Sequence, residues 1–593
     1  MTKRPSRTNP SRARLLGALA SLVTLLAAVT FASALGRADL WGFAPGLGLS
    51  IRWSIALPTV AIAVAYLIVR GVAGALPGVV LAPALLALAW LVRDALHLDG
   101  DGRLWLGFAN AGQLHSVSAP VIDRLTLALV EGGGRIGLSA ETSFALASLL
   151  AGGIYLGLVT LVRGELVERR DARVLALALL GPPILLFFGW IEIYAWVWVT
   201  GLAYLVLLLR GDGSGGRRAR SAGSSVEWVG VALGVLLPLV HPTLIVLLPA
   251  ALVAFPGRRG LTVAAGLAIP LAIAARVIVF GAGAWNPTAQ PVDVEHVAYA
   301  RGSARHLADS VQALLLCVPA AVILPWVAPR LDRVGRILAV ATGGAVVGFL
   351  FVTPELGYAR DWDLMSLPAL PLSLWTAREV ARLSGGAGLG RRVAAAAVGL
   401  TLACSSVWVA AHHGPVASLA RAELLARETS GNSAFARSHL HDDLSQVLEE
   451  RGRLEEARAQ AGRAADLLPE SARLRYRVGH LAFTARDLSK AEAELGRAVA
   501  LDPGLFDAQY LLGIVRMELG ASLAAIIPLE NAARLHPEDA RVRASLGAAL
   551  ARSGRVGDAR AQMTLIARGS HPSREAALDY VARVIAEVEN GQP

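Results

Sequence analysis

Charged residues and cysteines are scarce in this chain. Only 17% of its 593 residues are charged, whereas 55% are hydrophobic, and the apolar residues stand in long runs instead of alternating with polar ones. Such runs indicate a polytopic membrane protein. The two cysteines, Cys317 and Cys404, both lie inside apolar runs. The polar part of the chain can therefore form no disulfide of its own.

The positive charge is placed as in a membrane protein and not as in a nucleic-acid-binding protein. The net charge is +11, but the polar part contains no basic stripe interleaved with aromatic residues. The arginines gather in short segments between apolar runs, as the positive-inside rule requires. We therefore exclude nucleic acid as a partner. The basic N-terminal segment, which has no acidic residue, is predicted to lie in the cytoplasm.

Alternating sides from that start gives about 13 membrane crossings in a polytopic domain over residues 1–411. The stretch 226–255 is too long for one span of about 20 residues and too short for two, so 11 crossings plus a re-entrant hairpin at His241-Pro242 is an alternative. A cleaved signal peptide is the alternative for the first apolar run, which is longer than a usual signal core. With either count, the chain after His412 lies outside a membrane that we expect to be a bacterial cytoplasmic membrane.

The same count places most ionisable residues of the membrane domain on its outer face. Ionisable groups near membrane depth are costly and tend to be functional, so a shared outer site is the simplest account. The candidate residues are Asp99 and Asp101 in the outer loop 94–142, and Glu192, His241, Arg276, Arg360, Asp361 and Asp363 in later outer connections or span ends.

Asp99 and Asp101 offer the most direct chemistry. Two carboxylates separated by one glycine can hold a divalent cation such as Mg²⁺ or Mn²⁺, or supply a general base to a substrate hydroxyl. Asp-Gly pairs are also common in ordinary turns, because both residues tolerate unusual backbone angles. The loop by itself leaves both interpretations open.

The other candidates also have structural interpretations. Arg276 can extend to the membrane interface, and Arg360 can pair with the aspartates that follow it. Glu192 and His241 can be hydrogen-bonded residues at helix ends, which is the favoured interpretation for His241. The segment 360–363 holds two acids, an arginine and a tryptophan, which exceeds what a helix cap requires. We expect Arg360 at a wet membrane edge, where it supports little packing.

After His412 the sequence becomes polar and repeats with a period of 34 residues. The recurring residues are Ala457, Ala491, Ala525 and Ala559; Pro469, Pro503 and Pro537, with Pro572 one place late; and Gly479, Gly513 and Gly547. This is the tetratricopeptide (TPR) pattern, in which small residues let paired helices approach and proline ends the second helix. We predict a linker at 412–437 and a TPR domain at 438–593, made of four repeats and a capping helix near Arg574–Glu589. Such a solenoid presents a concave surface to partner segments.

Two stretches resemble the GT-C superfamily of integral membrane glycosyltransferases. LDGDGRLWLGFANAGQLHSVSAPVIDRLTLAL is similar to the acidic pair of an early outer loop in that superfamily, and GYARDWDLMSLPALPLSL resembles its arginine-plus-aromatic stretch before a proline-rich helix. Many spans followed by outward TPRs are similar to eukaryotic O-mannosyltransferases with TPRs. The chain departs from the family in separating Asp99 and Asp101 by a glycine and in placing two spans before the loop. Asp39, in the first short outer loop, is therefore an alternative for the family's first acid.

The resemblance implies an all-α fold and a transferase on the outer membrane face. A sugar would move from a polyprenyl-phosphate-linked donor to a protein or glycan acceptor, which the TPRs could bind. Asp99 or Asp101 would take the proton of the acceptor hydroxyl. Positive charge, or a metal held by these acids, would hold the lipid phosphate. The remaining roles are phosphate binding for Arg276 and Arg360, and substrate binding for Glu192, His241, Asp361 and Asp363.

Other classes of function fit the same sequence. One is a non-catalytic membrane scaffold whose TPRs recruit envelope assembly partners. Another is an enzyme like the O-antigen ligases or polymerases. The ligases usually place their working Arg and His residues on a long late outer loop, whereas the longest outer loops here are 94–142 and 281–309. Transport is disfavoured because no paired broken-helix pattern is evident in two halves.

Overall fold

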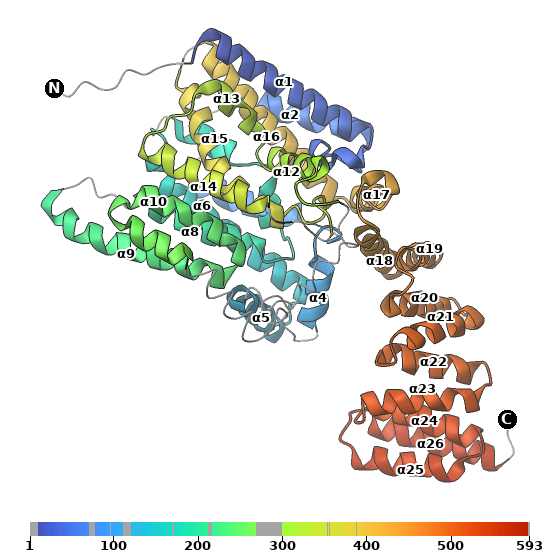
Figure 1. Cartoon of the computed structure of the whole chain (residues 1–593). Coiled ribbons are helices and arrows are strands. Elements are labelled where there is room, and N and C mark those ends of the chain that lie inside the picture. Colours follow the sequence, from blue (N-terminus) through green and yellow to red (C-terminus); the bar gives the residue numbers. More distant parts are fainter. Residues whose placement is uncertain are drawn as a thin grey trace. The chain divides into compact units, whose positions relative to one another are not determined.

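The protein is helical in both of its parts. The computed structural model describes residues 10–69, 78–94, 96–110, 120–168, 171–210, 216–267, 299–350, 352, 354, 356–386 and 388–590. Every regular element among these residues is a helix (Figure 1). The chain divides into two compact units, Met1–Ala436 and Arg437–Pro593. The predicted all-α fold is confirmed.

The first unit is built from helices of very unequal length. It begins with α1 (Arg12–Ala34), η1 (Ala38–Phe43), α2 (Ile51–Val69), α3 (Gly78–Leu91), α4 (Gly102–Asn110), α5 (Pro120–Arg135) and α6 (Ala140–Leu166). It continues with α7 (Ala172–Ala178), η3 (Pro182–Phe187), α8 (Tyr194–Arg210), α9 (Gly216–Val240), η4 (Pro242–Ala250), α10 (Ala251–Ala254) and η5 (Pro256–Arg258). The last elements are α12 (Ala304–Cys317), η7 (Pro319–Ile323), α13 (Leu324–Val327), α14 (Arg333–Phe349), η8 (Leu364–Ser366), α15 (Ala369–Ser384), α16 (Leu389–His413), α17 (Pro415–Leu425) and η9 (Glu428–Ser430).

Four of these helices, α1, α2, α6 and α16, are long and apolar enough to cross a membrane. Two bent pairs raise the number to six if each pair counts as one span. In one, Pro242–Ala254 meets Pro256–Leu267 at 111°, and in the other, Ala304–Cys317 meets Pro319–Val327 at 104°. α2 packs along α16, where a side chain at Gly399 would lie 3.3 Å from Ile62.

The predicted count of about 13 crossings is wrong. Among the described residues, several apolar runs after α6 form helices that are too short to span. α7 has 7 residues, η3 has 6, and α8 and α14 have 17 each. At 1.5 Å per residue, 17 residues reach about 25 Å, whereas the hydrocarbon core is about 30 Å thick. Pro182, Pro242 and Pro319 each begin a new 3₁₀ helix, because proline lacks the N–H that would continue the previous one.

Partly buried polar contacts join several helix ends on one side of the first unit. Arg333, at the start of α14, donates to the carbonyls of Leu208 and Leu209 at 3.0 and 2.8 Å, near the end of α8. Arg378, in the second half of α15, pairs with Asp332. Because α8 and α15 both end at this side, their starts meet at the other side. The residues that precede those starts form the candidate site.

The second unit is a TPR-like repeat region, as predicted. α18 (Ala434–Glu450) leads into it, and the following elements are α19 (Leu454–Leu467), α20 (Ala472–Thr484), α21 (Leu488–Leu501), α22 (Phe506–Glu518), α23 (Ser522–Leu535), α24 (Ala540–Arg552), α25 (Val556–Arg568) and α26 (Arg574–Glu589). The starts of α20, α22 and α24 are 34 residues apart, as are those of α21, α23 and α25. The last helix, α26, occupies the range expected for the capping helix.

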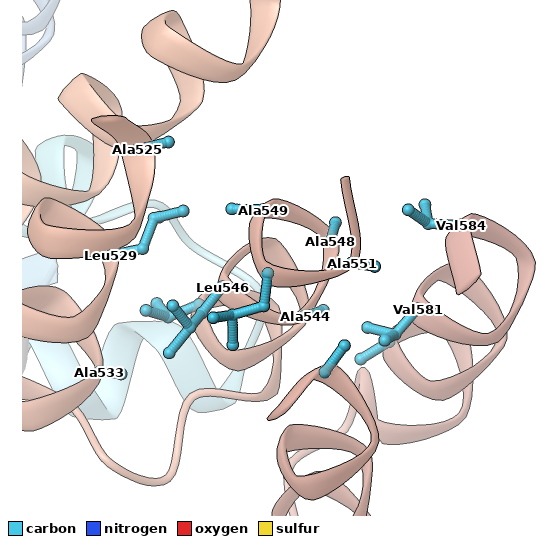
Figure 2. Packing of buried hydrophobic residues seen from close by; sticks show 14 of the residues in the cluster. Ala525, Leu529, Ala533, Ala544, Leu546, Ala548, Ala549, Ala551, Val581 and Val584 are labelled. Carbon is cyan, nitrogen blue, oxygen red and sulfur yellow. The ribbon is translucent and has the colours of Figure 1, made fainter. Parts of the chain in front are cut away.

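Glycine and alanine permit the close approach of the repeat helices. A Cβ atom at Gly479 would lie 2.7 Å from Leu495 Cγ, and one at Gly513 would lie 2.4 Å from Leu529 Cγ. Figure 2 shows Leu529 of α23 on one side of α24, and Val581 of α26 on the other. The unit is therefore held together by apolar contacts between helices that are neighbours in sequence.

Candidate functional site

Four carboxyl groups meet at one side of the first unit. Asp101 lies between α3 and α4, Glu192 directly before α8, and Asp361 and Asp363 between α14 and α15. We name these four residues the acid cluster. Its members influence one another electrostatically, since Asp101 and Asp363 both raise the pKa of Glu192 and Asp101 raises that of Asp361. The structure therefore joins three connections that are far apart in the sequence.

Gly100 determines how closely the first connection approaches the second. Its φ of +64° is a left-handed conformation that favours glycine. A Cβ atom at Gly100 would lie 1.9 Å from Glu192 Oε1, and the next backbone N–H, that of Asp101, donates to this oxygen at 2.5 Å. Arg360 Nη2 donates to the carbonyl oxygen of Gly100 at 2.9 Å. The turn 99–101 is thus attached to the other two connections through its backbone.

Glu192 and Asp363 share a hydrogen bond between their carboxyl groups. Burial, followed by the charge of Asp363, holds the pKa of Glu192 well above its ordinary value. Burial also raises the pKa of Asp363, to about 6, although hydrogen bonds from Glu192 and Trp190 oppose the shift. Trp190 Nε1 donates to Asp363 Oδ2 at 2.8 Å. Two adjacent carboxyl groups in a buried place retain a proton between them near neutral pH.

Asp99 is not part of the acid cluster, because its carboxylate is bound elsewhere. His412 Nε2 lies 2.7 Å from Asp99 Oδ2, and Arg421 Nε lies 3.0 Å from the same oxygen. Burial by itself would raise the pKa of Asp99, but the charge of Arg421 and the hydrogen bond of His412 lower it to about 2. Asp99 is therefore an ionised carboxylate inside a buried ion pair.

His97 attaches the same loop to the start of α6. Its Nδ1 lies 3.3 Å from Asp94 Oδ2, and its Nε2 lies 3.4 Å from Glu141 Oε1. Burial lowers the pKa of His97, but the charge of Asp94 and its hydrogen bond outweigh burial and raise the pKa to about 9. His97 also has a φ of +51°, which is uncommon for a residue other than glycine. These ion pairs hold an otherwise unfavourable backbone in place.

An aromatic wall of three tryptophans and a histidine lies beside these residues. Ring centroids are separated by 5.2 Å for Trp190 and Trp362, by 5.3 Å for Trp362 and Trp408, and by 4.4 Å for Trp408 and His412. The guanidinium of Arg421 lies 4.7 Å from the centroid of Trp408. The wall connects the surroundings of Asp99 with those of Asp363.

The structure places the other predicted residues as follows. His241 caps η4, where its side chain accepts the N–H of Thr243, and its ring lies 5.6 Å from that of Tyr194 at the start of α8. Asp39 is partly exposed and pairs with Arg37. Arg276 lies outside the described residues.

Arg360 differs from its predicted environment. Only 2% of its surface is exposed, whereas a wet membrane edge was expected. The reason is that its guanidinium reaches inward to Gly100 in a different connection.

Asp99 and Asp101, the two candidate metal ligands, have different neighbours in the structure. Asp99 contacts a histidine and an arginine, as described above, and the carboxylate that contacts Asp101 is that of Glu192. Within the described residues, no group of three or more His, Cys, Asp and Glu side chains is arranged to hold a metal ion.

Sequence reasoning missed Trp190, His412 and Arg421. His412 stands at the end of the last apolar helix, and an ionisable residue in that position is a signal for function. Arg421 lies in a short helix of mixed composition, where an arginine is usually at the surface. No local signal identified it as buried.

A cavity of about 410 Å³ lies between α8 and α9. Apart from Thr200 and the hydroxyl of Tyr204 its lining is apolar, and it comprises Thr200, Ala203, Tyr204, Leu207, Leu233, Leu236, Leu237 and Val240. Val240 is the residue before His241, which contacts Tyr194. The Val240 end of the cavity therefore lies beside a residue that contacts Tyr194, two residues after Glu192.

No protein-family model matches the chain, and no curated protein matches it. Solved TPR structures match about a quarter of it. YrrB, described as a TPR protein with an unusual peptide-binding site, is 23% identical, with 26% of this chain and 77% of that chain covered and a TM-score of 0.24. A crystal structure of MamA is 23% identical, with 25% and 74% covered and a TM-score of 0.21. These matches do not concern the chemistry of the acid cluster.

Proposed function

We propose that this protein is a membrane glycosyltransferase that moves a sugar from a polyprenyl-phosphate-linked donor to an acceptor on the outer membrane face. The observation that carries the proposal is the acid cluster with Arg360 beside it. Four carboxyl groups and a guanidinium come from three distant connections to one side of a unit whose longest helices are apolar enough to span a membrane. Maintaining so many ionisable groups in a buried place is costly, and this favours a functional site over a structural one.

Asp101 is the base in this proposal. Asp99 is bound to Arg421 and His412, and the carboxyl groups of Glu192 and Asp363 share a proton. Asp101 and Asp361 are both only partly buried. Burial and the charge of Asp101 raise the pKa of Asp361 well above its ordinary value, and its Oδ2 accepts the N–H of Leu356, so Asp361 is the poorer base. Asp101 contacts Glu192 through its backbone N–H. Its carboxylate is thus the member of the cluster that a substrate hydroxyl reaches most readily.

The reaction needs one proton transfer and one substitution. The Asp101 carboxylate takes the proton of the acceptor hydroxyl, and the hydroxyl oxygen forms the new bond to the anomeric carbon. The bond between that carbon and the phosphate oxygen breaks, and the electron pair leaves with the polyprenyl phosphate. A lipid phosphate is a good leaving group, so no acid is required. Arg360 supplies positive charge for the phosphate, and a carboxyl oxygen of the Glu192–Asp363 pair accepts a hydrogen bond from a sugar hydroxyl.

The apolar cavity between α8 and α9 supports a lipid-linked donor. Its lining is suited to a hydrocarbon chain, and a chain held there would leave its phosphate near His241 and Tyr194. The repeat unit would bind the acceptor or a partner protein, since TPR-like solenoids present a concave surface to extended segments.

Transfer assays with the full chain in membranes of the native cell test the proposal. The probe is a panel of short-chain polyprenyl-phosphate hexoses labelled in the sugar, and the readout is release of polyprenyl phosphate. Asp101→Asn is expected to lower the rate by about 100-fold to 10,000-fold, which is typical for loss of a positioned base. Asp39→Asn is the matched control, because Asp39 also follows an apolar helix but pairs with Arg37. Equal rates in wild type and Asp101→Asn would refute Asp101 as the base, and loss only in Asp39→Asn would transfer the role to Asp39.

A non-catalytic scaffold is the second candidate, and the tight packing around Gly100 favours it. A Cβ atom at Gly100 would lie only 1.9 Å from Glu192 Oε1. Arg360 and Arg421, which contact the turn 99–101, are both buried. A scaffold would release no polyprenyl phosphate from any donor of the panel, and its repeat unit would still retain partners.

A further inference from the structure

Arg421 is a buried arginine that lies outside the acid cluster but contacts both of the chain segments that carry aspartates of the cluster. It belongs to α17 and is 1% exposed. Its Nε lies 3.0 Å from Asp99 Oδ2, and its Nη2 donates to the carbonyl oxygen of Ala359 at 3.4 Å. Asp99 is two residues before Asp101, and Ala359 is two residues before Asp361. One guanidinium therefore connects the two segments.

The contact with Asp99 is energetically important because both charges are buried. Removal of one partner from a buried ion pair leaves an uncompensated charge, which is more costly than the pair is favourable. The planar guanidinium also fits a geometry that lysine cannot reproduce, since it donates to a carboxylate and to a carbonyl at the same time while its face packs on Trp408. The site thus requires arginine specifically.

The turn 99–101 has little freedom to adjust. Its first residue is held by Arg421 and His412, the carbonyl of Gly100 is held by Arg360, and the N–H of Asp101 is held by Glu192. A change at Asp99 is therefore transmitted to Asp101 through a short turn in which the Gly100 carbonyl and the Asp101 N–H are both hydrogen-bonded. The hydrogen bond from Arg421 to the carbonyl of Ala359 likewise links Arg421 to Asp361, two residues further along the chain.

We propose that Arg421 is a positioning residue: it sets the separation between the turn 99–101 and the segment 359–363, and so aligns the Asp101 carboxylate with Arg360. This inference rests on the proposed transferase function. A displacement of about 1 Å in a reacting group can lower a rate by about 100-fold. The proposal places Arg421 outside the donor and acceptor sites, so its loss should lower kcat while the donor KM changes little.

Arg378 is a matched control. It is also buried in the first unit, and it likewise combines one carboxylate, that of Asp332, with one carbonyl, that of Arg330 at 3.4 Å. Arg378 lies at the side where α8 and α15 end, whereas the acid cluster lies at the side where these helices begin. Because Asp332 is about half exposed and Asp99 is buried, Arg378→Met should destabilise the fold less than Arg421→Met. A role in folding alone should leave the kcat per folded molecule unchanged in both variants.

The experiment compares Arg421→Lys, Arg421→Met and Arg378→Met in the full chain, with rates expressed per folded molecule. Arg421→Met is expected to lower kcat by about 100-fold and Arg421→Lys by about 10-fold, whereas Arg378→Met keeps the wild-type kcat even if it unfolds at a lower temperature. A wild-type kcat in folded Arg421→Met would overturn the proposal.

Hydrogen exchange supplies a readout that does not depend on activity. In Arg421→Met, peptides covering 98–104 and 356–364 should both exchange faster than in wild type, and neither should change in Arg378→Met. Unchanged exchange in both peptides would refute the positioning role. If wild-type protein transfers no sugar from any donor, the transferase function fails, and the exchange result alone decides whether Arg421 couples the two segments.

Discussion

Arg360 Nη2 donates to the carbonyl oxygen of Gly100 at 2.9 Å, across 260 residues of sequence. The bond attaches the segment before α15 to the turn before α4, and both groups are buried. A hydrogen bond from a charged donor in such a place contributes about 1.5 to 3 kcal/mol to stability. The same arginine is the proposed phosphate ligand, so the proposal gives it a functional role in addition to this structural one.

Substitution of Arg360 should therefore affect stability as well as activity. We expect Arg360→Ala to abolish sugar transfer and to lower the melting temperature of the full chain, because the Gly100 carbonyl loses its partner. Arg360→Lys keeps the charge but loses the two-pronged geometry for phosphate, and it should weaken donor binding. Thermal unfolding and donor titration measure the two effects separately. An unchanged melting temperature in Arg360→Ala would contradict the buried position.

The ion pairs of His97 should make stability fall at alkaline pH. Its pKa is raised to about 9 in the folded protein from about 6.5 when unfolded. The stabilisation is therefore fully present below pH 6.5 and is lost as the pH rises through 9. The shift corresponds to about 3 kcal/mol at most.

Thermal unfolding of wild type and His97→Gln at pH 6, 7.5 and 9.5 measures this contribution. The difference in melting temperature should be largest at pH 6 and should disappear near pH 9.5. Exposed His413 provides the control, as His413→Gln should show no such convergence. A difference that does not depend on pH would show that His97 stabilises the loop by packing alone.

Gly513 should tolerate no side chain in the repeat unit. A Cβ atom there would lie 2.4 Å from Leu529 Cγ, and such overpacking costs about 1 to 3 kcal/mol. Gly513→Ala should accelerate hydrogen exchange in α22 and α23 of the full chain. A Cβ atom at Gly496 would instead point into open space, so Gly496→Ala should slow exchange slightly, as expected for alanine in a helix. Identical effects of both substitutions would argue against close packing at Gly513.

Membrane topology can be tested with single cysteines, since both native cysteines, Cys317 and Cys404, are buried. The proposed outer-face site requires an odd number of crossings, because four or six would leave the repeat unit on the same side as the N-terminus. In a Cys317→Ala, Cys404→Ala background, Ile136→Cys and Lys490→Cys should then react with a membrane-impermeant maleimide in intact cells. Arg391→Cys should react only after the membrane is opened. Protection of the cysteine at position 490 in intact cells would place the repeat unit in the cytoplasm and refute the outer-face site.

The sequence alone predicted those parts of the fold that depend on local pattern. The 34-residue period specified the repeat unit, because each helix pair packs mainly on neighbours in sequence, and small residues recur where the helices touch. Long uninterrupted apolar runs likewise identified α1, α2, α6 and α16. The number of spans was wrong because run length does not show where prolines divide an apolar stretch into short helices.

For the candidate site, the sequence predicted several of the residues but not how they are arranged. Local sequence identified Asp101, Glu192, Arg360, Asp361 and Asp363 as costly ionisable residues in connections between apolar runs. These residues lie close together in the structure, but local sequence does not distinguish the two acids of the first loop. Asp99 and Asp101 look equivalent in sequence.

Only the tertiary structure separates these two aspartates. The partners of Asp99, His412 and Arg421, are 313 and 322 residues away in sequence, whereas the backbone of Asp101 is held by Glu192. Local residue patterns determine which helices form and which faces are apolar. Whether a carboxylate is neutralised by a distant arginine depends on how those helices pack, because electrostatic pairing acts through space and leaves no periodic signal along the chain.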